Sequence, residues 1–452
     1  MKSKEAAEYL QDKKVLIVGL GKTGLSCAHF LSACDADVAI TDSRTEPPFL
    51  TRLQQELPET ALFLGGFDEL AFRRADIIVV SPGVSLREAL IVEARARGAR
   101  IIGDIELFAW FVDVPVIAIT GSNGKSTVTT LVGEMFNRSG IKAGVGGNIG
   151  TPALDLLRED NQVCVLELSS FQLETTESLD PIAAVLLNIS EDHLDRYDTL
   201  ADYTAAKARI FYGSGILVVN ADDEHVMATA QLFAAGRKLI SFSLDMPKAD
   251  QYGICVQQNE RWLCRGEQAL IACDELKITG EHNLANALAA LALGEAAGLA
   301  LPAMLEALRD FAGLPHRCQW VRKKAGVTWI NDSKATNVGA AIAAIQGVPG
   351  EKLVVILGGQ GKGQDFRALR DVIARRARAV VLIGEDAPLL QQELAGLVKI
   401  EDASSMQDAV NKSVVLAQTG DTVLLSPACA SFDLFSGFEQ RGEAFTKSVR
   451  SL

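Results

Sequence analysis

Short apolar runs alternate along this chain with longer segments of helical periodicity. In the first part, apolar runs of strand length occupy residues 14–20, 37–40 and 75–81, and a helical pattern follows the first run as far as about Ala33. Strands that alternate with helices predict a parallel sheet with helices on both faces. We expect a Rossmann-like first domain at residues 1–103.

The same alternation resumes in the middle of the chain. Apolar runs predict buried strands at residues 114–120, 163–168, 183–188 and 215–220, with a helix at residues 125–139 after the first of them. Residues 244–278 have the pattern of short strands and turns, and helical patterns return at residues 283–297 and 302–311. These elements predict a second domain, built on a parallel sheet, at residues 104–313.

A third set of apolar runs completes the pattern. The expected strands are residues 328–331, 353–357, 379–383 and 422–425, with helices between them. This arrangement predicts a second Rossmann-like domain at residues 314–452. The fold class that we expect is therefore α/β, with three domains.

Composition and charge narrow the classes of function. The chain has 452 residues, of which 48% are apolar, and its net charge is −13. This charge argues against electrostatic capture of nucleic acid or of an anionic membrane. The longest apolar stretches have only strand length, and residues 1–12 lack the apolar run of a signal peptide, so we expect a cytoplasmic protein without a membrane span.

Eight cysteines are scattered through the chain, and no pair has Cys-x-x-Cys spacing. Metal-binding and redox motifs depend on such spacing. We therefore expect buried or incidental thiols in a reducing compartment, without disulfides.

The second domain opens with a phosphate-binding signature. Gly-Ser-Asn-Gly-Lys-Ser-Thr at residues 121–127 follows a predicted strand and precedes a predicted helix. Glycines allow backbone N–H groups to surround phosphate oxygens, and the helix N-terminus adds positive potential. Lys125 would reach the β- and γ-phosphates, and Ser126 would bind Mg²⁺. The usual loop has glycine where this chain has Ile119, but the remaining pattern still predicts nucleotide binding.

Two further residues are candidate metal ligands. Glu167 lies within the apolar run at residues 163–168, at the sheet edge where ligands of open α/β sheets bind. His193 follows the run at residues 183–188. Carboxylate, hydroxyl and water suit Mg²⁺, whereas imidazole is a less usual ligand. A single histidine is more often structural, but a phosphate loop nearby favours a metal role for His193.

The first domain carries a second glycine motif. Gly19, Gly21 and Gly24 follow a strand with dinucleotide-binding spacing, and Asp42 ends the next strand. Alone, this pattern indicates NAD. The motif is less specific than this, however, because the backbone N–H groups at a helix N-terminus can bind any diphosphate. A nicotinamide-dependent oxidoreductase and a diphosphate-containing substrate therefore both remain open at this point.

Blocks of residues along essentially the whole chain are similar to the Mur ligases of peptidoglycan synthesis. They lie at residues 120–127, 146–150, 167–174, 192–196, 205–207, 282–283, 314–317, 331–337, 426–433 and 438–442. The blocks most resemble the members that add D-glutamate. Ligases that add diaminopimelate or lysine usually carry an Asp-Asn-Pro-Arg-like motif, which this sequence lacks. Folylpolyglutamate synthases share the ATP loop but have no N-terminal UDP-sugar unit.

The resemblance implies an ATP-dependent ligase that joins D-glutamate to UDP-N-acetylmuramoyl-L-alanine through an acyl phosphate. The first domain would bind the UDP-sugar, the second ATP, and the third the amino acid. ATP and two Mg²⁺ ions are the implied cofactors, and we expect a monomer. A nicotinamide-dependent oxidoreductase would leave Lys125 and Glu167 unexplained, and a non-catalytic nucleotide sensor would bind ATP without releasing phosphate.

The resemblance also assigns roles to individual residues. ATP would be bound by Gly121, Ser122, Asn123, Gly124, Lys125, Ser126, Thr127, Asn283, Arg317, Asp332 and Lys334. The two Mg²⁺ ions would be held by Ser126, Glu167, His193 and Lys207, with Lys207 carried as a carbamate. Without this resemblance, the sequence would indicate that Lys207 is an ordinary exposed lysine on a helix. The catalytic residues would be Lys125, Lys207, His193 and Asn148.

Substrate-binding residues are implied in all three domains. The UDP-sugar would lie against Lys22, Thr23, Asp42, Ser43, Arg44, Ser81 and Gly83, with Asn148 and Ser169 contributed by the second domain. D-Glutamate would lie near Thr336, Lys362, Ser431 and Phe438. Around Lys362 the match to the family pattern is looser.

Overall fold

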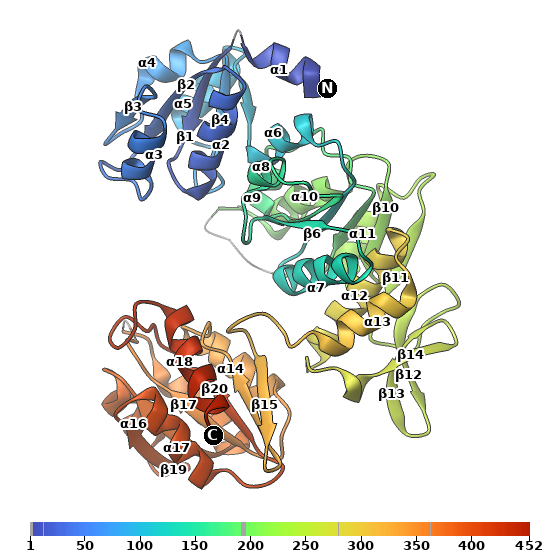
Figure 1. Ribbon diagram of the computed structural model, residues 1–452, viewed down its shortest axis with the longest axis vertical. Helices are drawn as coiled ribbons and strands as arrows, with labels where there is room; N and C mark the ends of the chain where they lie inside the picture. The colour runs from blue at the N-terminus through green and yellow to red at the C-terminus, as the bar shows by residue number, and fades with distance from the viewer. Residues whose placement is uncertain (1–2, 12, 191–195, 279, 362) are drawn as a thin grey trace. The chain divides into compact units, whose positions relative to one another are not determined.

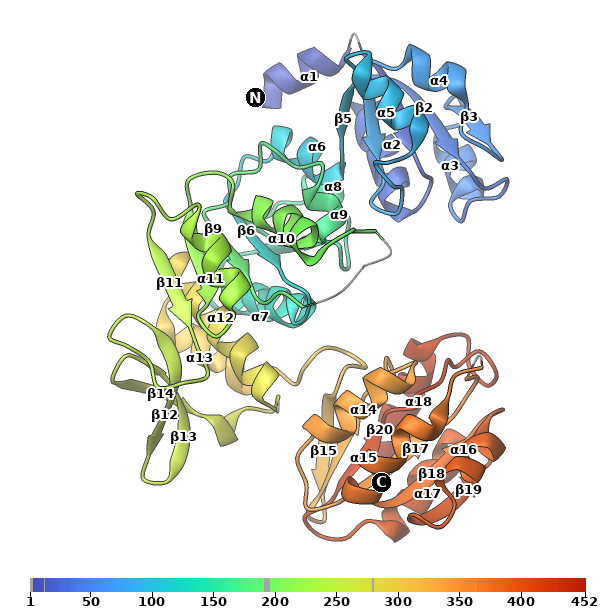
Figure 2. The same cartoon turned by 180° about the vertical axis from the view of Figure 1, so that it is seen from behind.

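The computed structural model describes residues 3–11, 13–190, 196–278, 280–361 and 363–452 (Figure 1; Figure 2 shows the reverse side). The contacts within the chain separate it into two compact units. The first comprises Met1–Ile271 and Ala285–Leu308, and the second comprises Ala272–Leu284 and Arg309–Leu452. The first unit contains two sheets and the second contains one.

The N-terminal sheet is parallel and has the order β3-β2-β1-β4-β5. Its strands are β1 Lys14–Val18, β2 Asp37–Asp42, β3 Ala61–Leu64, β4 Ile77–Val80 and β5 Arg100–Ile102. Its helices are α1 Ser3–Gln11, α2 Lys22–Ala33, α3 Leu50–Glu56, α4 Glu69–Arg74 and α5 Ala89–Ala96. Successive residues of β1 enter different cores, since Val15 and Ile17 pack with α2 while Leu16 and Val18 pack with α4 and α5. Both faces of the sheet are therefore covered, as the sequence predicts.

The central sheet has the order β14-β13-β12-β11-β10-β9-β6-β8-β7. Its strands are β6 Val116–Thr120, β7 Ala143–Gly147, β8 Val163–Glu167, β9 Ala183–Leu186, β10 Ile216–Asn220, β11 Leu239–Phe242, β12 Tyr252–Gln257, β13 Glu260–Arg265 and β14 Gln268–Ala272. The pairs from β7 to β12 are parallel, whereas β12 and β13 are antiparallel. The predicted parallel sheet is confirmed, with an antiparallel hairpin added at one end.

Helices cover this central sheet (Figure 1). They are α6 Asp104–Phe111, α7 Lys125–Arg138, α8 Ala153–Leu156, α9 Ser170–Leu173, α10 Leu200–Ala208, α11 Glu224–Gln231, α12 Glu281–Ala296 and α13 Leu301–Asp310, with the 3₁₀ turn η1 Arg209–Phe211. The 3₁₀ turn η2 Cys273–Glu275 belongs to the second unit. No helix in the described part of the chain is both long and apolar enough to cross a membrane.

The expectation that no cysteines are paired is wrong for one pair. Cys255 on β12 and Cys264 on β13 form a disulfide, with their Cα atoms 6.2 Å apart. The antiparallel register places Cys264 opposite Gly253 and Cys255 opposite Trp262, so the two cysteines are diagonal neighbours on one face. Spacing rules for Cys-x-x-Cys motifs cannot detect a pair that is brought together by a hairpin.

The C-terminal sheet has the order β15-β16-β20-β17-β18-β19. Its strands are β15 Gln319–Lys324, β16 Val327–Asn331, β17 Leu353–Leu357, β18 Ala377–Ile383, β19 Lys399–Ala403 and β20 Thr422–Leu425; only the edge strand β15 pairs antiparallel among the pairs described. Its helices are α14 Val338–Gly347, η3 Phe366–Leu369, α15 Arg370–Arg376, α16 Ala387–Leu394, α17 Met406–Leu416 and α18 Phe438–Arg450. One core contains residues of α14, α15 and α16, and the other contains residues of α17 and α18 (Figures 1 and 2).

Candidate active site

The glycine-rich loop between β6 and α7 has the backbone that its sequence predicts. Gly124 precedes α7 with φ of 84°, and a Cβ added there would lie 2.3 Å from Asn286 Oδ1. Gly121 has φ of 155°, and its Cβ would lie 2.9 Å from Leu187 Cβ. Both positions require glycine, because any side chain would meet a positive φ and a close neighbour.

Hydrogen bonds from the segment after β9 hold this loop. Asn188 binds it three times: its carbonyl accepts from Ser122 N at 2.9 Å, its Oδ1 accepts from Asn123 N at 2.8 Å, and its Nδ2 donates to Asn123 O at 3.1 Å. The hydroxyl of Ser122 accepts from Ser190 N at 2.9 Å and lies 3.2 Å from Tyr203 Oη. The loop is therefore already ordered to receive phosphate, which reduces the entropic cost of binding.

Two lysines converge on the same loop. Lys125 Nζ donates to the carbonyls of Gly121 and Ser122, both at 2.9 Å. Lys207 Nζ, on α10, donates to Gly121 O at 2.8 Å and lies 4.8 Å from the centre of the Tyr203 ring. Lys207 is only 1% exposed, so it is not the surface lysine that its sequence alone would suggest. Charge of this kind, held near a phosphate loop, favours anionic ligands.

A carboxylate stands beside the loop. The strand β8 pairs with β6, with Glu167 opposite Ile119. Glu167 is buried; its Oε1 accepts from Asn148 Nδ2 at 2.7 Å, and its backbone carbonyl accepts from Asn148 N at 2.8 Å. Its Oε2 is buried without a hydrogen-bond partner in the described part of the chain. A buried, half-satisfied carboxylate of this kind fits a hard cation such as Mg²⁺.

The described residues contain no cluster of three or more His, Cys, Asp or Glu side chains that could hold a metal ion. Hydroxyl, water and phosphate oxygens are ligands that suit an Mg²⁺ ion beside Glu167. His193, the other predicted metal ligand, lies outside the described residues.

A cleft of about 470 Å³ opens between the N-terminal and central sheets of the first unit. Seven residues that the sequence assigns to the UDP-sugar line it, and so does Asn148: the seven are Lys22, Thr23, Asp42, Ser43, Arg44, Ser81 and Gly83. They lie after the carboxyl ends of β1, β2 and β4, where ligands of open α/β sheets bind. The structure thus brings together side chains that are more than a hundred residues apart in the sequence.

In the turn after β1, Gly24 and Gly21 differ in whether the protein itself leaves room for a side chain. A Cβ at Gly24 would lie 2.0 Å from Gly19 O, so close packing of α2 on β1 excludes a side chain there. At Gly21, by contrast, φ is −95° and no described atom lies within 4 Å of an added Cβ. Nothing described in the protein requires Gly21 to be glycine, whereas a phosphate approaching the backbone from the cleft would require it.

Asp42 is already engaged inside the protein. Its Oδ2 accepts from Leu20 N at 2.7 Å and from Arg44 Nη2 at 2.7 Å, and its Oδ1 accepts from Arg44 N at 2.9 Å and Nε at 2.8 Å. Burial would raise the pKa of Asp42, but these hydrogen bonds outweigh it and lower the pKa to about 2. A carboxylate committed to Arg44 is poorly placed to bind the ribose of NAD, so the cleft favours a different diphosphate ligand.

Other predicted residues have structural roles as well. Ser81 Oγ donates to Gly19 O at 3.0 Å, which joins the turns after β1 and β4. Lys22 Nζ donates to Gly150 O at 2.6 Å. Ser169 caps α9 through its hydroxyl, which accepts from Gln172 N at 3.2 Å. Ser169 does not line the cleft, whereas Gln172, in the same sequence block, does.

Sequence reasoning did not select several residues that line the cleft. They are Phe67, Pro82, Val84, Gly147, Gly150, Pro152 and Gln172. The blocks at residues 146–150 and 167–174 were available signals for Gly147, Gly150 and Gln172. The other four, Phe67, Pro82, Val84 and Pro152, lie outside every recognised block.

The second unit places Asp332 directly after β16, beside the end of β20. Ser426 Oγ donates to Asp332 Oδ2 at 2.7 Å, and Cys318 N donates to Oδ1 at 3.1 Å. Burial dominates and raises the pKa of Asp332 to about 6, against these hydrogen bonds. Arg317 lies in the preceding turn, where its N donates to Leu314 O at 3.1 Å, and its charge acts to lower that pKa.

Lys334 and Phe438 form a second group in this unit. Lys334 Nζ lies 3.8 Å from the centre of the Phe438 ring, a cation–π contact. Ser333 Oγ donates to Phe438 O at 2.8 Å, and Thr336 N donates to Lys334 O at 2.8 Å. The loop at residues 332–336 is thus tied to the start of α18.

Arg441 on α18 supports the surrounding backbone. It is buried and donates to Ser333 Oγ and O, and to the carbonyls of Cys429 and Ala430. Burial lowers the pKa of Arg441 to about 10. Ser431, which directly follows Ala430 in the sequence, is also buried. The family-implied residue Asn283 lies near the start of α12, and Lys362 lies outside the described residues.

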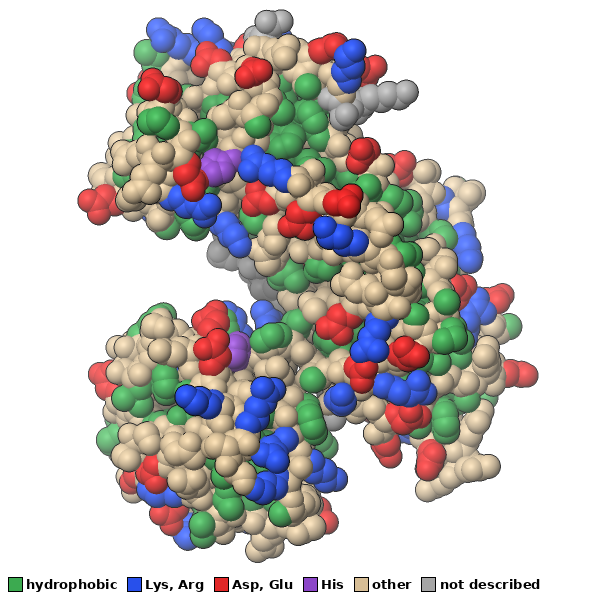
Figure 3. Space-filling view, in the orientation of Figure 1, with side chains coloured by type: hydrophobic (Ala, Val, Ile, Leu, Met, Phe, Trp, Pro, Cys, Tyr) green, Lys and Arg blue, Asp and Glu red, His purple; other side chains and the backbone are tan. Residues whose placement is uncertain are grey.

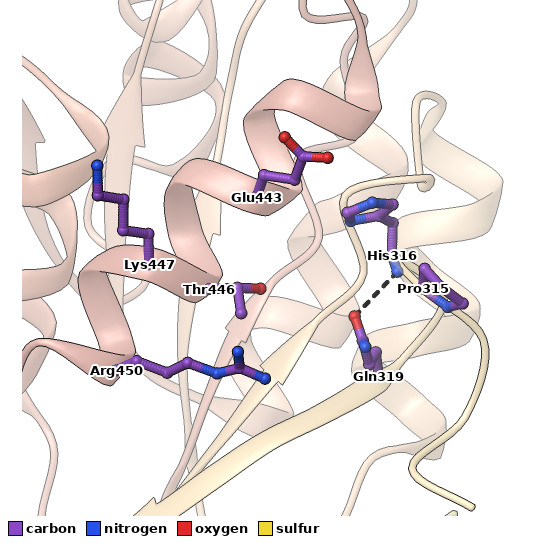
Figure 4. A pocket seen from close by; sticks show the side chains of 7 residues that line it. All are labelled: Pro315, His316, Gln319, Glu443, Thr446, Lys447 and Arg450. Carbon is purple, nitrogen blue, oxygen red and sulfur yellow. Dashed lines mark hydrogen bonds between the residues drawn. The ribbon is translucent and has the colours of Figure 1, made fainter.

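A separate cavity of about 490 Å³ adjoins the turn at residues 314–317 (Figure 4). Arg450 extends from α18 toward Gln319, and His316 N donates to Gln319 Oε1 at 3.2 Å. None of the residues predicted for the site lines this cavity in the described part of the chain. On the face shown in Figure 3, Lys and Arg side chains lie beside Asp and Glu side chains over much of the surface.

Comparisons with known proteins agree with these observations. Three family models match: "Mur ligase MurD-like, N-terminal domain" at residues 13–103, "Mur ligase middle domain" at residues 119–294, and "Mur ligase, glutamate ligase domain" at residues 316–429. The UDP-N-acetylmuramoylalanine–D-glutamate ligase of Nitrosococcus oceani is 54% identical, with 97% of this chain and 96% of the relative covered. The same-named ligase of Pseudomonas aeruginosa is 49% identical, with 97% and 98% covered.

Solved structures resemble this fold as well. The UDP-N-acetylmuramate–alanine ligase of Thermotoga maritima covers 97% of this chain and is itself 99% covered, with a TM-score of 0.56 and 20% identity. At this level of identity the likeness concerns the fold alone.

Proposed function

The chain belongs to the Mur ligase family, and we propose from this premise that it joins D-glutamate to UDP-N-acetylmuramoyl-L-alanine at the expense of ATP. The relatives at 54% and 49% identity carry this activity in their names. The proposed domains are residues 1–103 for the UDP-sugar, 104–313 for ATP and 314–452 for the amino acid. The proposed setting is cytoplasmic precursor synthesis by a monomer.

One observation carries the proposal: Asn148 belongs to both sites. It lines the cleft assigned to the UDP-sugar, and it donates to Glu167 beside the phosphate loop. A UDP-sugar with its diphosphate at Gly21 would extend toward Asn148, so its terminal carboxylate would approach the γ-phosphate of ATP. An enzyme that phosphorylates a carboxylate needs this adjacency.

The substrate carboxylate must be activated before it can form an amide. A carboxylate does not react with amines because its oxygen leaves poorly. In the proposed first step a carboxylate oxygen of the alanyl group attacks the γ-phosphorus, the bond to the β,γ-bridging oxygen breaks, and ADP departs. Lys125 and the backbone N–H groups of residues 121–124 would offset the charge on the transferring phosphoryl group.

Mg²⁺ fits the residues beside this loop. Ser126 and Glu167 would hold one ion, and Lys207 as a carbamate would serve with His193 for the second. Bound Mg²⁺ neutralises phosphate charge and polarises phosphoryl oxygens. The orphaned Oε2 of Glu167 supports this assignment, and burial of Lys207 against Gly121 O places its amine where a carbamate would face the loop.

The second step forms the amide. The amine of D-glutamate attacks the acyl phosphate carbon, and the tetrahedral intermediate expels phosphate after the amine has lost a proton. Lys334, Thr336, Ser431 and Phe438 are proposed to hold the amino acid together with Lys362. Asp332 is proposed to bind the ATP ribose together with Arg317 and Asn283.

Phosphate release tests the proposal. Purified protein with ATP, Mg²⁺ and UDP-N-acetylmuramoyl-L-alanine should release phosphate when D-glutamate is supplied, and far less with L-glutamate, L-lysine or diaminopimelate. Mass spectrometry of the product should show one added glutamyl residue. Absence of phosphate release with D-glutamate at every Mg²⁺ concentration would contradict the proposal, as would a better rate with another amino acid.

A further inference from the structure

Arg196 connects the wall of the UDP-sugar cleft to the central sheet. Its guanidinium donates to Pro82 O at 3.3 Å and to Val84 O at 3.1 Å, which are carbonyls of the turn after β4. It also pairs with Glu174 Oε2 at 3.1 Å, after α9. The side chain of Arg196 is only 14% exposed, so these contacts are largely shielded from water. Pro82, Gly83 and Val84 all line the cleft.

The same guanidinium begins a series of ring contacts that ends at the phosphate loop. It lies 4.4 Å from the centre of the Phe171 ring, which stacks on Tyr197 at 6.1 Å. Tyr197 meets Tyr203 edge-on at 5.3 Å. Tyr203 then contacts the loop twice, through its hydroxyl, 3.2 Å from Ser122 Oγ, and through its ring face below Lys207.

The chemistry of these contacts is specific to arginine. A planar guanidinium can donate to two carbonyls and a carboxylate in fixed directions while its face stacks on an aromatic ring. A lysine ammonium is a point charge and cannot reproduce all four contacts. The pre-organised guanidinium fork also loses less conformational freedom for each hydrogen bond formed.

We propose that Arg196 is a positioning residue that holds the 82–84 turn of the UDP-sugar cleft to the aromatic series supporting the phosphate loop, so that binding of the UDP-sugar and of ATP is coupled. This inference rests on the proposed function. Arg196 contacts neither substrate directly in this account. It acts through the turn on one side and through Phe171, Tyr197 and Tyr203 on the other.

Arg87 provides a matched control. Its guanidinium pairs with Asp198 at 2.7 Å, so it too joins the N-terminal domain to the segment just after Arg196. Both partners are exposed, however, at 64% and 71% of their side-chain surfaces. Exposed pairs of this kind contribute little. A substitution of Arg87 therefore removes an arginine bridge of similar location without the buried contacts.

Calorimetry measures the coupling. The Kd of UDP-N-acetylmuramoyl-L-alanine is determined with and without saturating non-hydrolysable ATP analogue plus Mg²⁺, for wild type, R196K, R196Q and R87K. We expect the analogue to tighten binding in wild type and R87K by at least about threefold, within the usual range of such coupling. In both Arg196 variants we expect the ratio of the two Kd values to fall to about one.

Two results would overturn the inference: a ratio of one in the wild-type protein, or the wild-type ratio in R196K and R196Q. A purely structural defect would reduce the fraction of protein that binds and leave the ratio unchanged in the molecules that remain folded. Melting curves identify variants that do not fold, and either Arg196 variant carries the test if the other does not fold.

The wild-type assay separates this test from that of the function. If wild type releases no phosphate with D-glutamate, the proposed function fails, whatever the Arg196 variants do. If wild type is active and the Arg196 variants keep the wild-type ratio, the function stands and only the positioning role is lost. Steady-state kinetics add a second readout: KM for the UDP-sugar should rise about tenfold in R196Q while KM for D-glutamate stays constant.

Discussion

The two glycine-rich turns of the first unit have the same arrangement of strand, turn and helix but differ in the side chains that surround them. Each follows a buried parallel strand, and each precedes a helix that begins with lysine, Lys22 in α2 and Lys125 in α7. The first turn borders an open cleft, and its lysine reaches Gly150 O in the central domain. The second is bound by Asn188 and Ser190 and faces Lys207.

This difference separates binding from chemistry. Both turns can hold a diphosphate, because backbone N–H groups at a helix N-terminus suffice for that. Of the two turns, only the second has, among the described residues, an unsatisfied carboxylate on the neighbouring strand, Glu167. The motif therefore identifies a phosphate site, and the surrounding side chains decide whether a phosphoryl group is transferred there.

The largest expected effect comes from exchanging the two lysines for alanine in separate variants. Lys125→Ala should lower kcat for phosphate release by about a thousandfold or more, because the cation acts on charge that develops in the transition state. Lys22→Ala should raise KM for the UDP-sugar about tenfold and leave kcat within about twofold. Comparable losses of kcat in the two variants would contradict the division into a binding turn and a reaction turn.

The next effect concerns Lys207. Lys207→Ala should lower kcat about a hundredfold, since the proposed carbamate ligand of the metal would be lost. Formate or acetate at high concentration should restore part of the rate, because a small carboxylate can occupy the vacated space. Lys125→Ala serves as the control and should show no rescue. Failure of short acids to restore Lys207→Ala would count against the carbamate.

Glycine substitutions in the first turn should give opposite results. Gly21→Ala should raise KM for the UDP-sugar about tenfold with little change in melting temperature, because no described atom lies near the added methyl group. Gly24→Ala should instead lower the melting temperature, since its methyl group would overlap Gly19 O. Thermal melts and substrate titrations of both variants measure these outcomes. A Gly21→Ala protein that melts early would show that the glycine serves the fold.

The smallest expected effect is the contribution of the Asp42–Arg44 pair to the pH dependence of the unfolding free energy. The pKa of Asp42 is lowered to about 2 in the folded protein. A depressed carboxyl pKa stabilises the fold fully above the unfolded value of about 3.9, and this stability is lost as the pH falls toward 2. We expect Arg44→Ala to cost about 1 kcal/mol at pH 7, since Arg44 is half exposed.

Denaturant titrations of wild type and Arg44→Ala at several pH values provide the measurement. The difference in unfolding free energy should be constant from pH 8 to 5 and should shrink below pH 4. A difference that grows as the pH falls would have the wrong sign and would contradict the assigned pairing.

Buried strands and turn chemistry were predictable from the sequence because they depend on neighbours along the chain. β1, β6, β8, β17 and β20 are continuous apolar runs, since parallel strands are covered on both faces. The strands that the pattern did not predict are β3, β5, β7, β15 and β19, which lie at sheet edges, and β11, which lies inside the central sheet. Edge strands bury less surface and so carry weaker apolar periodicity.

The sequence by itself therefore determined the α/β class, the two glycine turns and, through the resemblance, the family. Tertiary structure alone decided which side chains meet: Asn148 with Glu167, Lys207 with the phosphate loop, and Cys255 with Cys264. The physical reason is the distance along the chain over which each kind of interaction acts. Periodicity, propensity and turn geometry act within a few residues, whereas burial, pKa and pairing depend on packing between segments that the strand order brings together.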